Sequence, residues 1–357
     1  MRRLALGLIG LAVGLAAGAA APQPAAQPAL PAAGEPHLPP APPPVAPLRR
    51  GPDGQIEAVD PEAVRRAGQA LCDKGAICVG PGQRYRTLAA GLAAAQDGAL
   101  VELVGGTYRE SASIARSRLT LRGVAGRPHI DCAHAALAGG RACLLLAGDK
   151  ITLDNLELSG AAPAEGTDAA AACIANEPGR DFHLSRILCH DSENGIVAHG
   201  GTIEIAESEF YNNGAGKGSG NAAFDQGCLL TVRGSTFRDA RAGAELVSRC
   251  SGTTISDSSF RSAASGVMLD LPDGGETLVY RSRFEKVLDA GSGDIIRFAE
   301  DDCRNPGTVV FKEVRIVNSR LDTALRNYDR CRGDAIVLER VTFDGVPPRE
   351  IGYILTR

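Results

Sequence analysis

The sequence predicts an all-β protein: a right-handed parallel β-helix solenoid with an N-terminal capping α-helix. Three observations predict this fold. A segment with helical spacing leads directly into a strand, and a strand pattern with one shared frame then recurs eight times along the chain. In addition, the 357 residues include 43 glycines and no tryptophan, and only 4% are aromatic, which suits stacked coils with many tight turns.

The first residues carry the pattern of a secretory signal peptide. Two arginines follow Met1, residues 4–18 are uninterruptedly apolar, and residues 17–19 (Ala-Gly-Ala) match an A-x-A cleavage site. The alternative is an uncleaved membrane anchor, but this apolar stretch is barely long enough to span a bilayer and is rich in Gly and Ala. We therefore expect residues 1–19 to be removed, and the protein to be periplasmic or secreted with no stable membrane insertion.

A disordered tether is predicted between the signal peptide and the folded part. Residues 20–53 are mostly Pro and Ala and lack apolar periodicity, so they cannot form a core. Such a composition favours extended polyproline II conformations. We expect the β-helix domain to occupy residues 54–357, beginning with a stretch between Gly54 and Ala70 that has the pattern of a short helix.

Residues 85–108 predict a helix followed by the first strand of the solenoid. Leu88, Leu92 and Ala95 lie three to four residues apart and therefore share one helix face. Gly98 ends the helix, and the residues after it alternate as a strand does before a Gly-Gly turn. We expect this helix to cover the open N-terminal end of the solenoid, because an exposed strand edge promotes aggregation.

Eight later segments of eight residues share one frame. The third position is apolar, the fourth and fifth are a polar pair, the sixth is small or apolar, and the eighth is apolar and usually Phe. A β-sandwich would also give short strands between turns, but not one frame in eight segments. The segments are residues 151–158, 182–189, 203–210, 230–237, 253–260, 277–284, 309–316 and 336–343.

The eighth positions of these segments recur every 21 to 32 residues, which is the length of one solenoid coil with variable turns. Each coil returns the chain to the same angular position about 4.8 Å higher, so equivalent residues stack into ladders. We interpret the eighth positions as one inward-facing ladder of the core. They are Leu158, Cys189, Phe210, Phe237, Phe260, Phe284, Ile316 and Phe343.

Ten cysteines in a chain with an export signal indicate an oxidising compartment and a disulfide framework. Because adjacent strands lie about 4.8 Å apart, within the Cα separation of a disulfide, we expect pairs inside one loop or between neighbouring coils. Cys143 and Cys173 occupy similar positions and are an alternative pair. The predicted pairs are Cys72–Cys78, Cys132–Cys143, Cys173–Cys189, Cys228–Cys250 and Cys303–Cys331.

The helix-to-strand segment and the coil frame together resemble the pectin-lyase-like right-handed parallel β-helix superfamily, over roughly residues 85–343. The resemblance implies this fold and a polysaccharide as substrate class and partner. The residues that carry it best are Tyr85, Thr87, Leu88, Gly98, Val101, Leu103, Gly106 and Tyr108.

The motifs of individual subfamilies are missing from the sequence. The G-H-G of polygalacturonase-like glycosidases is approached only by residues 198–201, and the Asp-Pro-His of mannuronan epimerases only by residues 127–129. No cluster of Asp with Arg matches the calcium sites of pectate lyases. The resemblance therefore implies no catalytic residue, and we predict no cofactor; calcium is not supported by a motif.

The charge of the chain argues against one class of partner. The formal net charge of -4 at pH 7 is close to neutral for this length, whereas a nucleic-acid-binding protein needs a basic face. We therefore expect a polysaccharide partner and no nucleic acid.

One candidate site lies on the second strand of each coil, where outward residues form the usual binding groove of a β-helix. Side chains alternate between the two faces of a strand. In residues 195–199 and 266–270 this alternation predicts that His199 and Asp270 face outward at equivalent positions several coils apart, with Glu245 nearby.

The other candidate site lies near the C-terminus. Residues 298–304 (FAEDDCR) and 326–332 (RNYDRCR) match position for position at an offset of 28 residues. A coil with this offset would stack Asp301 near Asp329, Glu300 near Tyr328, and Cys303 on Cys331.

This C-terminal cluster has the groups that uronate chemistry requires. Proton abstraction beside a carboxylate needs a base and a cation that neutralises the carboxylate. We predict Tyr328 as the base, Arg297 and Arg326 as cations, and Asp301 and Asp329 as the residues that orient them, with His199 as the alternative site. A solvated turn with charge-paired neighbours would give the same pattern.

We hypothesise that the protein binds an acidic polysaccharide and cleaves or epimerises it, as a polysaccharide lyase, epimerase or glycosidase. The alternative is a non-catalytic structural or adhesive solenoid of the cell envelope, held away from its anchor point by the tether. The missing subfamily motifs favour this alternative. The charged clusters favour binding or catalysis, because a structural solenoid does not require them.

Overall fold

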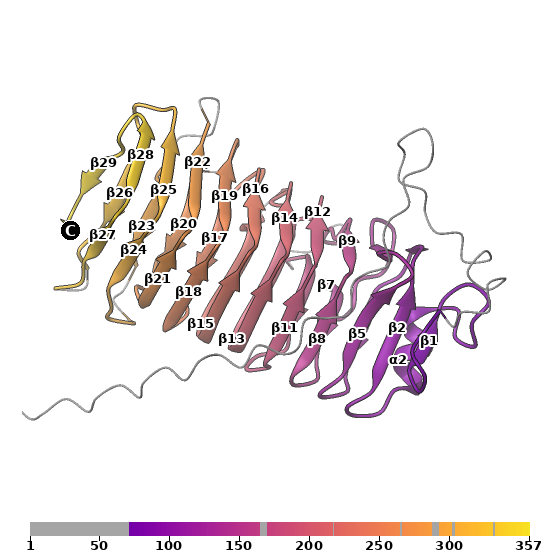
Figure 1. Cartoon of the computed structure of the whole chain (residues 1–357). Helices are drawn as coiled ribbons and strands as arrows, with labels where there is room; N and C mark the ends of the chain where they lie inside the picture. Colours follow the sequence, from indigo (N-terminus) through magenta and orange to yellow (C-terminus); the bar gives the residue numbers. More distant parts are fainter. Residues whose placement is uncertain are drawn as a thin grey trace, which may run out of the picture. The chain divides into compact units, whose positions relative to one another are not determined.

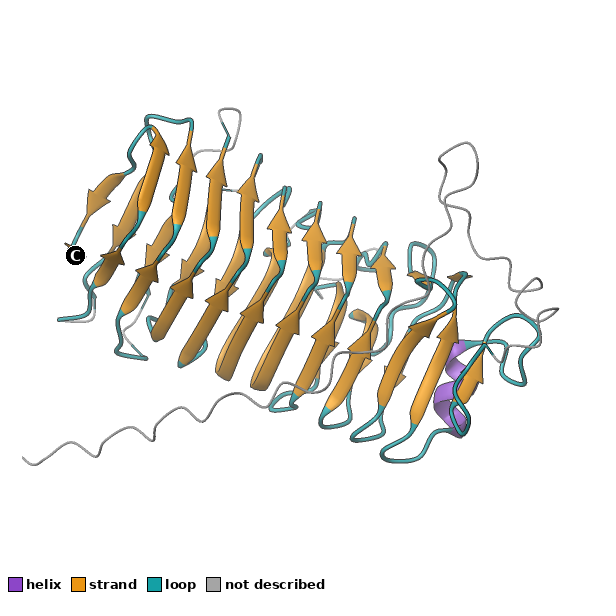
Figure 2. Ribbon diagram, in the orientation of Figure 1, coloured by secondary structure: helices purple, strands orange, loops and turns teal. Residues whose placement is uncertain are grey.

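The computed structural model describes residues 71–164, 170–216, 218–264, 266–287, 293–301, 304–330 and 333–357. The predicted signal peptide, the tether and the helix expected between Gly54 and Ala70 lie outside these residues. In the described part the chain forms one helix and a stack of strands that wind into coils (Figure 1). A typical coil adds one strand to each of three faces, so the predicted right-handed parallel β-helix is confirmed (Figure 2).

We name the three faces sheet 1, sheet 2 and sheet 3, in the order in which a coil passes through them; their strand pairings are parallel. Two long strands, β13 (Asn194–Ala206) and β15 (Gly220–Arg233), turn the corner from sheet 3 into sheet 1 and belong to both. Sheet 1 also contains β1 (Ile77–Val79), β2 (Leu100–Val104), β5 (Thr120–Val124), β8 (Ile151–Asp154), β11 (Phe182–Ser185), β18 (Gly252–Ser256), β21 (Glu276–Tyr280), β24 (Val309–Lys312), β27 (Ile336–Glu339) and β30 (Ile354–Thr356). Sheet 2 contains β3 (Thr107–Tyr108), β6 (His129–Asp131), β9 (Glu157–Ser159), β12 (Leu188–His190), β14 (Glu209–Tyr211), β16 (Thr236–Arg238), β19 (Ser259–Ser262), β22 (Arg283–Lys286), β25 (Arg315–Asn318) and β28 (Thr342–Gly345). Sheet 3 also contains β4 (Ala112–Ile114), β7 (Ala142–Leu146), β10 (Ala172–Asn176), β17 (Ala244–Ser248), β20 (Val267–Leu271), β23 (Ile296–Phe298), β26 (Ala324–Asn327) and β29 (Arg349–Ile351).

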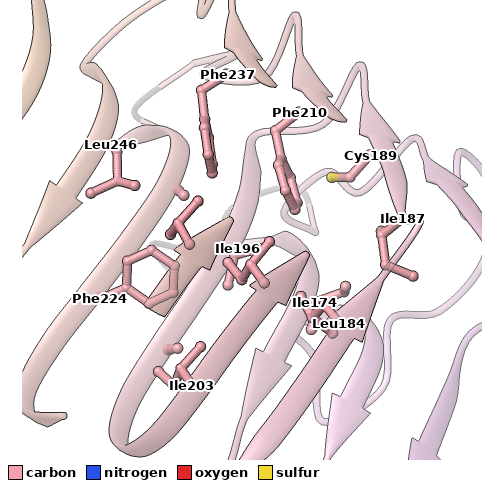
Figure 3. Packing of buried hydrophobic residues seen from close by; sticks show 14 of the residues in the cluster. Ile174, Leu184, Ile187, Cys189, Ile196, Ile203, Phe210, Phe224, Phe237 and Leu246 are labelled. Carbon is pink, nitrogen blue, oxygen red and sulfur yellow. The ribbon is translucent and has the colours of Figure 1, made fainter. Parts of the chain in front are cut away.

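The predicted core ladder is confirmed. The register of sheet 2 pairs each eighth position with the eighth position of the next coil, through all eight segments. Phe210, Phe237, Phe260 and Phe284 are fully buried, and the centroids of successive rings lie 4.7 to 5.3 Å apart. Figure 3 shows the first two of these rings pointing into the interior toward residues of the other sheets, such as Ile196.

The fifth position of the frame forms the corner between sheet 1 and sheet 2. In all eight segments this residue has a positive φ, between 44° and 57°. Seven of the eight are not glycine, so each carries a conformational cost of about 1–2 kcal/mol. The polar pair in the sequence therefore marks a repeated corner. The eight corner residues are Asn155, Arg186, Glu207, Gly234, Asp257, Arg281, Glu313 and Arg340.

The sixth position carries a ladder of buried hydroxyl groups. In four consecutive segments it is a serine: Ser208, Ser235, Ser258 and Ser282. The backbone N–H of each of the first three donates to the hydroxyl of the next, with N–O distances of 3.2 Å. Each hydroxyl donates in turn to a carbonyl oxygen two residues earlier in its own coil. These buried polar groups are therefore satisfied inside the corner.

The predicted N-terminal helix is α2 (Leu88–Ala94). Leu88 and Ala95 are fully buried, and the helix packs against β1, β2 and β4 at the end of the solenoid (Figure 1). The Thr87 hydroxyl accepts a hydrogen bond from the first turn, and the Glu110 carboxylate accepts two more from backbone N–H groups of that turn. A carboxylate at a helix N-terminus satisfies N–H groups that have no partner within the helix.

Four of the predicted disulfides are confirmed: Cys72–Cys78, Cys132–Cys143, Cys173–Cys189 and Cys228–Cys250. The alternative pairing of Cys143 with Cys173 is wrong, because each is bonded to another cysteine. The fifth predicted pair, Cys303 with Cys331, lies outside the described residues. Within the described ranges, no helix is both long and apolar enough to cross a membrane.

Candidate functional site

Sheet 3 carries an outward ladder of residues whose character changes along the solenoid. Its first six members are small or apolar, and its next three are the charged residues Asp270, Arg297 and Arg326. The strand register places all of them one above another. In order, the ladder consists of Ser113, Leu145, Ala175, Val197, Ala223, Val247, Asp270, Arg297, Arg326 and Ile351.

Asp270 and Arg297 line a cavity of about 370 Å³ on this face. Most of its remaining wall consists of glycines and small or apolar side chains from successive coils. Gly293 is one of these residues: its φ is +145°, and a Cβ atom there would lie 1.8 Å from the carbonyl oxygen of Gly266. The close approach of the backbones excludes a larger side chain at this position, which keeps the cavity open.

The ion pair of the buried Asp270 with the half-buried Arg297 is chemically unusual. Arg297 Nη2 lies 2.6 Å from Asp270 Oδ2. Burial raises the pKa of Asp270 to about 6, although the guanidinium of Arg297 acts in the opposite direction. Asp270 Oδ1 and Arg297 Nε are buried and have no hydrogen-bond partner among the described residues. Such atoms are costly to leave unsatisfied, so water or a polar group of a ligand is needed to complete their hydrogen bonds.

Further charged groups surround this pair. Arg326 forms a twofold ion pair with Asp294, with distances of 2.7 Å from Nε to Oδ2 and 3.1 Å from Nη2 to Oδ1. Asp294 lines the same cavity. Glu300 Oε2 lies 3.1 Å from Arg297 Nη1, and the Arg326 guanidinium lies 5.7 Å from the centre of the Tyr328 ring. The structure therefore brings Arg297, Arg326 and Tyr328 together.

The environment of Tyr328 does not favour a role as a base. Burial and the carboxylate of Glu300 raise the pKa of Tyr328, and they outweigh the opposite effect of Arg326. A raised pKa keeps the phenol protonated at neutral pH, so this side chain is suited to donate a hydrogen bond. Asp270, whose pKa of about 6 lies close to neutral pH, is the better candidate for proton transfer.

Asp301 and Asp329 do not line this cavity. Asp301 Oδ2 lies 2.8 Å from Arg249 Nη1 in a separate cluster. Asp329 is exposed on a turn, where its φ is 55°. Arg297 and Arg326 are instead paired with Asp270 and Asp294, which take the orienting role that the sequence assigned to Asp301 and Asp329. Of the two arginines, Arg297 lines the cavity and Arg326 does not.

The predicted match between residues 298–304 and 326–332 is wrong by one residue. β23 and β26 pair Arg297 with Arg326, an offset of 29 residues instead of 28. The core decides this register: Phe298 is fully buried, and pairing it with Arg326 would direct an arginine inward. Consequently the two arginines stack on each other on the outer face.

The prediction that His199 and Asp270 occupy equivalent positions in their coils is wrong: His199 lies two residues further along its strand of sheet 3. The register aligns Asp270 with Val197, whereas His199 is paired with Asp225 in the next coil. His199 Nδ1 lies 3.1 Å from Asp225 Oδ2. The histidine therefore has an orienting partner, but it does not line the cavity that contains Asp270.

Glu245 faces the interior, although strand alternation predicts that it lies near the groove. Its side chain is fully buried and accepts a hydrogen bond of 2.5 Å from Asn221 Nδ2. Its carboxylate also acts on the buried Lys286, whose pKa burial lowers to about 8 against the effect of Glu245. Ala244 and Val247, three residues apart, both line the groove, so strict alternation fails between them.

Sequence reasoning missed Asp294 as a member of the site. No motif marks this residue. The one signal is the run Asp294-Ile-Ile-Arg297, in which an apolar pair separates two charged residues. Their common cavity becomes visible only once the coils are stacked.

No family model matches this chain, and no curated protein sequence matches it. Among solved structures, the pectin methylesterase of Aspergillus niger is 13% identical, with a TM-score of 0.46 and coverage of 80% of this chain and 91% of that chain. The pectin methylesterase of rice weevil is 12% identical, with a TM-score of 0.41 and coverage of 79% and 93%. The A-module of the mannuronan C-5 epimerase AlgE6 of Azotobacter vinelandii is 10% identical, with a TM-score of 0.29 and coverage of 74% and 92%.

The coil stack is a right-handed parallel β-helix. Similarity at this level of identity transfers no residue role to this chain. The function has to be inferred from the site itself.

Proposed function

We propose that this protein binds an acidic polysaccharide in the groove of sheet 3 and catalyses a proton-transfer reaction on it, with Asp270 as the acid–base group. The observation that carries this proposal is the partly buried pair of Asp270 and Arg297. Each residue has one polar atom without a partner among the described residues, and both line an open cavity. The disulfides and the predicted signal peptide support export to the periplasm or the exterior, where such polymers are encountered.

Two carboxyl groups in unequal environments line the cavity. Asp270, with a pKa of about 6, carries a proton for part of the time near neutral pH and can donate it. Asp294, the second carboxyl group, forms a twofold ion pair with Arg326. The cleavage of a glycosidic bond uses two carboxyl groups, one of which donates a proton. Elimination or epimerisation of a uronate would use the same acid–base exchange.

The charge balance of the site predicts how an anionic ligand binds. With every group ionised, the carboxylates Asp270, Asp294 and Glu300 exceed Arg297 and Arg326 by one charge. Protonation of Asp270 makes this group of five neutral, so the group no longer repels a ligand carboxylate. We therefore expect binding of an acidic polysaccharide to strengthen as the pH falls toward the pKa of Asp270.

The reaction is tested by incubating the protein with acidic and neutral polysaccharides and measuring three products in parallel. Ultraviolet absorbance of an unsaturated uronate reports elimination. New reducing ends without that absorbance report hydrolysis, and an altered uronate composition without either reports epimerisation. Absence of all three products with every polymer would contradict a catalytic role.

The site is tested with variants in whichever assay gives a signal. Asp270→Asn keeps the shape of the side chain but cannot exchange the proton, so we expect turnover to fall by about 100-fold or more. Val247→Ala, which changes an uncharged residue of the same cavity, is the matched control. Tyr328→Phe and Arg326→Ala are compared with His199→Ala at matched melting temperature, and loss of activity only in the His199 variant would show that the site lies elsewhere.

A non-catalytic structural or adhesive solenoid is the second candidate function. One observation favours it: Arg297, which lines the cavity, and its neighbour Arg326 are both already paired with carboxylates, as in a purely structural network. This alternative predicts no product from any polymer and equal polysaccharide binding by the wild-type chain and Asp270→Asn. The experiments above therefore separate the two functions.

A further inference from the structure

A second cluster of side chains lies on the outer surface of sheet 2, a face that the proposed polysaccharide site does not use. It contains His129 from β6, Glu157 from β9 and His190 from β12, which belong to three successive coils (Figure 1 labels β9 and β12). One ligand atom from each residue lies within 4.8 Å of the others. Two imidazoles and a carboxylate on one side of a sheet are a set of metal-binding groups.

The orientation of the two imidazoles is set by other residues. His129 Nε2 lies 2.8 Å from the Ser159 hydroxyl, and His190 Nδ1 lies 2.8 Å from the Asp191 carboxylate. The remaining nitrogens, His129 Nδ1 and His190 Nε2, lie 3.9 and 3.3 Å from Glu157 Oε1. Histidine ligands of metals typically hydrogen-bond through the other ring nitrogen to a carboxylate or another oxygen, which holds the ring and its tautomer.

We infer that His129, Glu157 and His190 form a binding site for a divalent transition-metal ion, and that zinc fits it best. Two histidines and one carboxylate are a ligand set that zinc takes in sites with an open fourth position. Tetrahedral zinc with bonds of about 2.0–2.1 Å places its ligand atoms about 3.3 Å apart, close to the two distances at Glu157. Calcium and magnesium fit poorly, because they prefer oxygen ligands.

The surroundings support the ligands and leave one side of the site open. The ring of Tyr211 stacks on His190 with centroids 4.8 Å apart, and the Arg238 guanidinium lies 4.2 Å from the centre of the Tyr211 ring. The side chains of the three ligands are 14 to 28% exposed, so an ion from solvent can reach the site. A bound ion would also join three successive coils.

The test is a zinc titration by calorimetry, using the chain purified without a polyhistidine tag and stripped of metal with a chelator. We expect one zinc ion per chain, no competition by calcium, and a visible absorption band when cobalt replaces zinc. Glu157→Gln and His190→Ala should abolish binding, and Asp191→Asn should weaken it by about 10–100-fold. His183→Ala should bind normally: His183 also faces a carboxylate, Glu204 at 3.2 Å, but no third ligand completes that pair among the described residues.

Two outcomes of the titration would contradict the metal site. One is absence of saturable zinc binding by the wild-type chain, and the other is binding that persists in both Glu157→Gln and His190→Ala. Circular dichroism of the metal-free variants checks that each is folded, which we expect because the three side chains face outward. Zinc should raise the melting temperature of the wild-type chain but not that of Glu157→Gln.

Discussion

The outward ladder on sheet 3 has an apolar part and a charged part. The two parts share one pattern of strand pairing and differ in their side chains. Over its first six coils the ladder is small or apolar, and Leu145 packs there with Ala138. Over the next three coils the same positions carry Asp270, Arg297 and Arg326, and the first two of these line an open cavity. Because strand pairing and coil frame are the same in both parts, the solenoid determines where these side chains lie, and their identity determines the chemistry. The charged part differs from the apolar part at three consecutive positions of the same ladder.

The largest expected effect tests the scaffold that both parts share. Phe260 is fully buried between Phe237 and Phe284, so Phe260→Ala should lower the free energy of unfolding by about 3–5 kcal/mol in chemical denaturation. Leu229, which is 54% exposed, is the matched control, and Leu229→Ala should have little effect. Equal losses for the two variants would contradict the core ladder.

The next effect concerns the disulfide between Cys228 and Cys250, which joins two neighbouring coils where the apolar part of the ladder meets the charged part. Replacing Cys228 and Cys250 by serine removes a disulfide that closes a segment of 22 residues. We expect the free energy of unfolding to fall by about 3 kcal/mol, because the unfolded chain regains conformational freedom. The melting temperature of the double variant should be less sensitive to reductant than that of the wild-type chain. If reductant lowers both melting temperatures equally, this disulfide contributes no stability.

A smaller effect distinguishes the charged part through its pH dependence. Asp270 has a pKa of about 6 in the folded chain and about 3.9 when unfolded, so the folded chain binds this proton more tightly. Its contribution to stability is therefore present at low pH and is lost as the pH rises from about 4 to 6. Relative to wild type, Asp270→Asn should gain about 2–3 kcal/mol between pH 4 and 7, measured by denaturation.

Val247→Ala is the control for this pH experiment, because it alters the apolar residue one coil earlier and removes no titrating group. Its difference from wild type should not vary with pH. A difference for Asp270→Asn that is equally constant would show that burial does not perturb this carboxyl group.

The smallest expected effect shows that charge alone does not make a site. Arg281 pairs with Asp257 on the surface, with a distance of 2.8 Å from Nε to Oδ1, and both side chains are well exposed to solvent. Exposed ion pairs contribute little to stability, so Arg281→Ala should leave the melting temperature and any polysaccharide binding unchanged. A loss of binding in this variant would place the ligand on the corner between sheets 1 and 2.

The sequence by itself determined the features that depend on local repetition. The ladder from Leu158 to Phe343 was predicted residue by residue, because one apolar side chain per coil must return to the same place in the core. The N-terminal helix and four disulfides followed from helical spacing and from the short distance between neighbouring strands. Each of these inferences needs only residues within one coil or its neighbour.

The tertiary structure decided everything that depends on register across coils of unequal length. Sheet 3 is apolar on both faces for most of its length, so the sequence pattern does not define which residues of neighbouring coils are paired. It could not show that Arg326 is paired with Arg297 instead of Phe298, or that Asp270 aligns with Val197. For the same reason, the pattern could not show that Glu245 faces the interior, where it is fully buried. The cluster of His129, Glu157 and His190 has no motif spacing, because its members meet only when turns of different length bring three coils together.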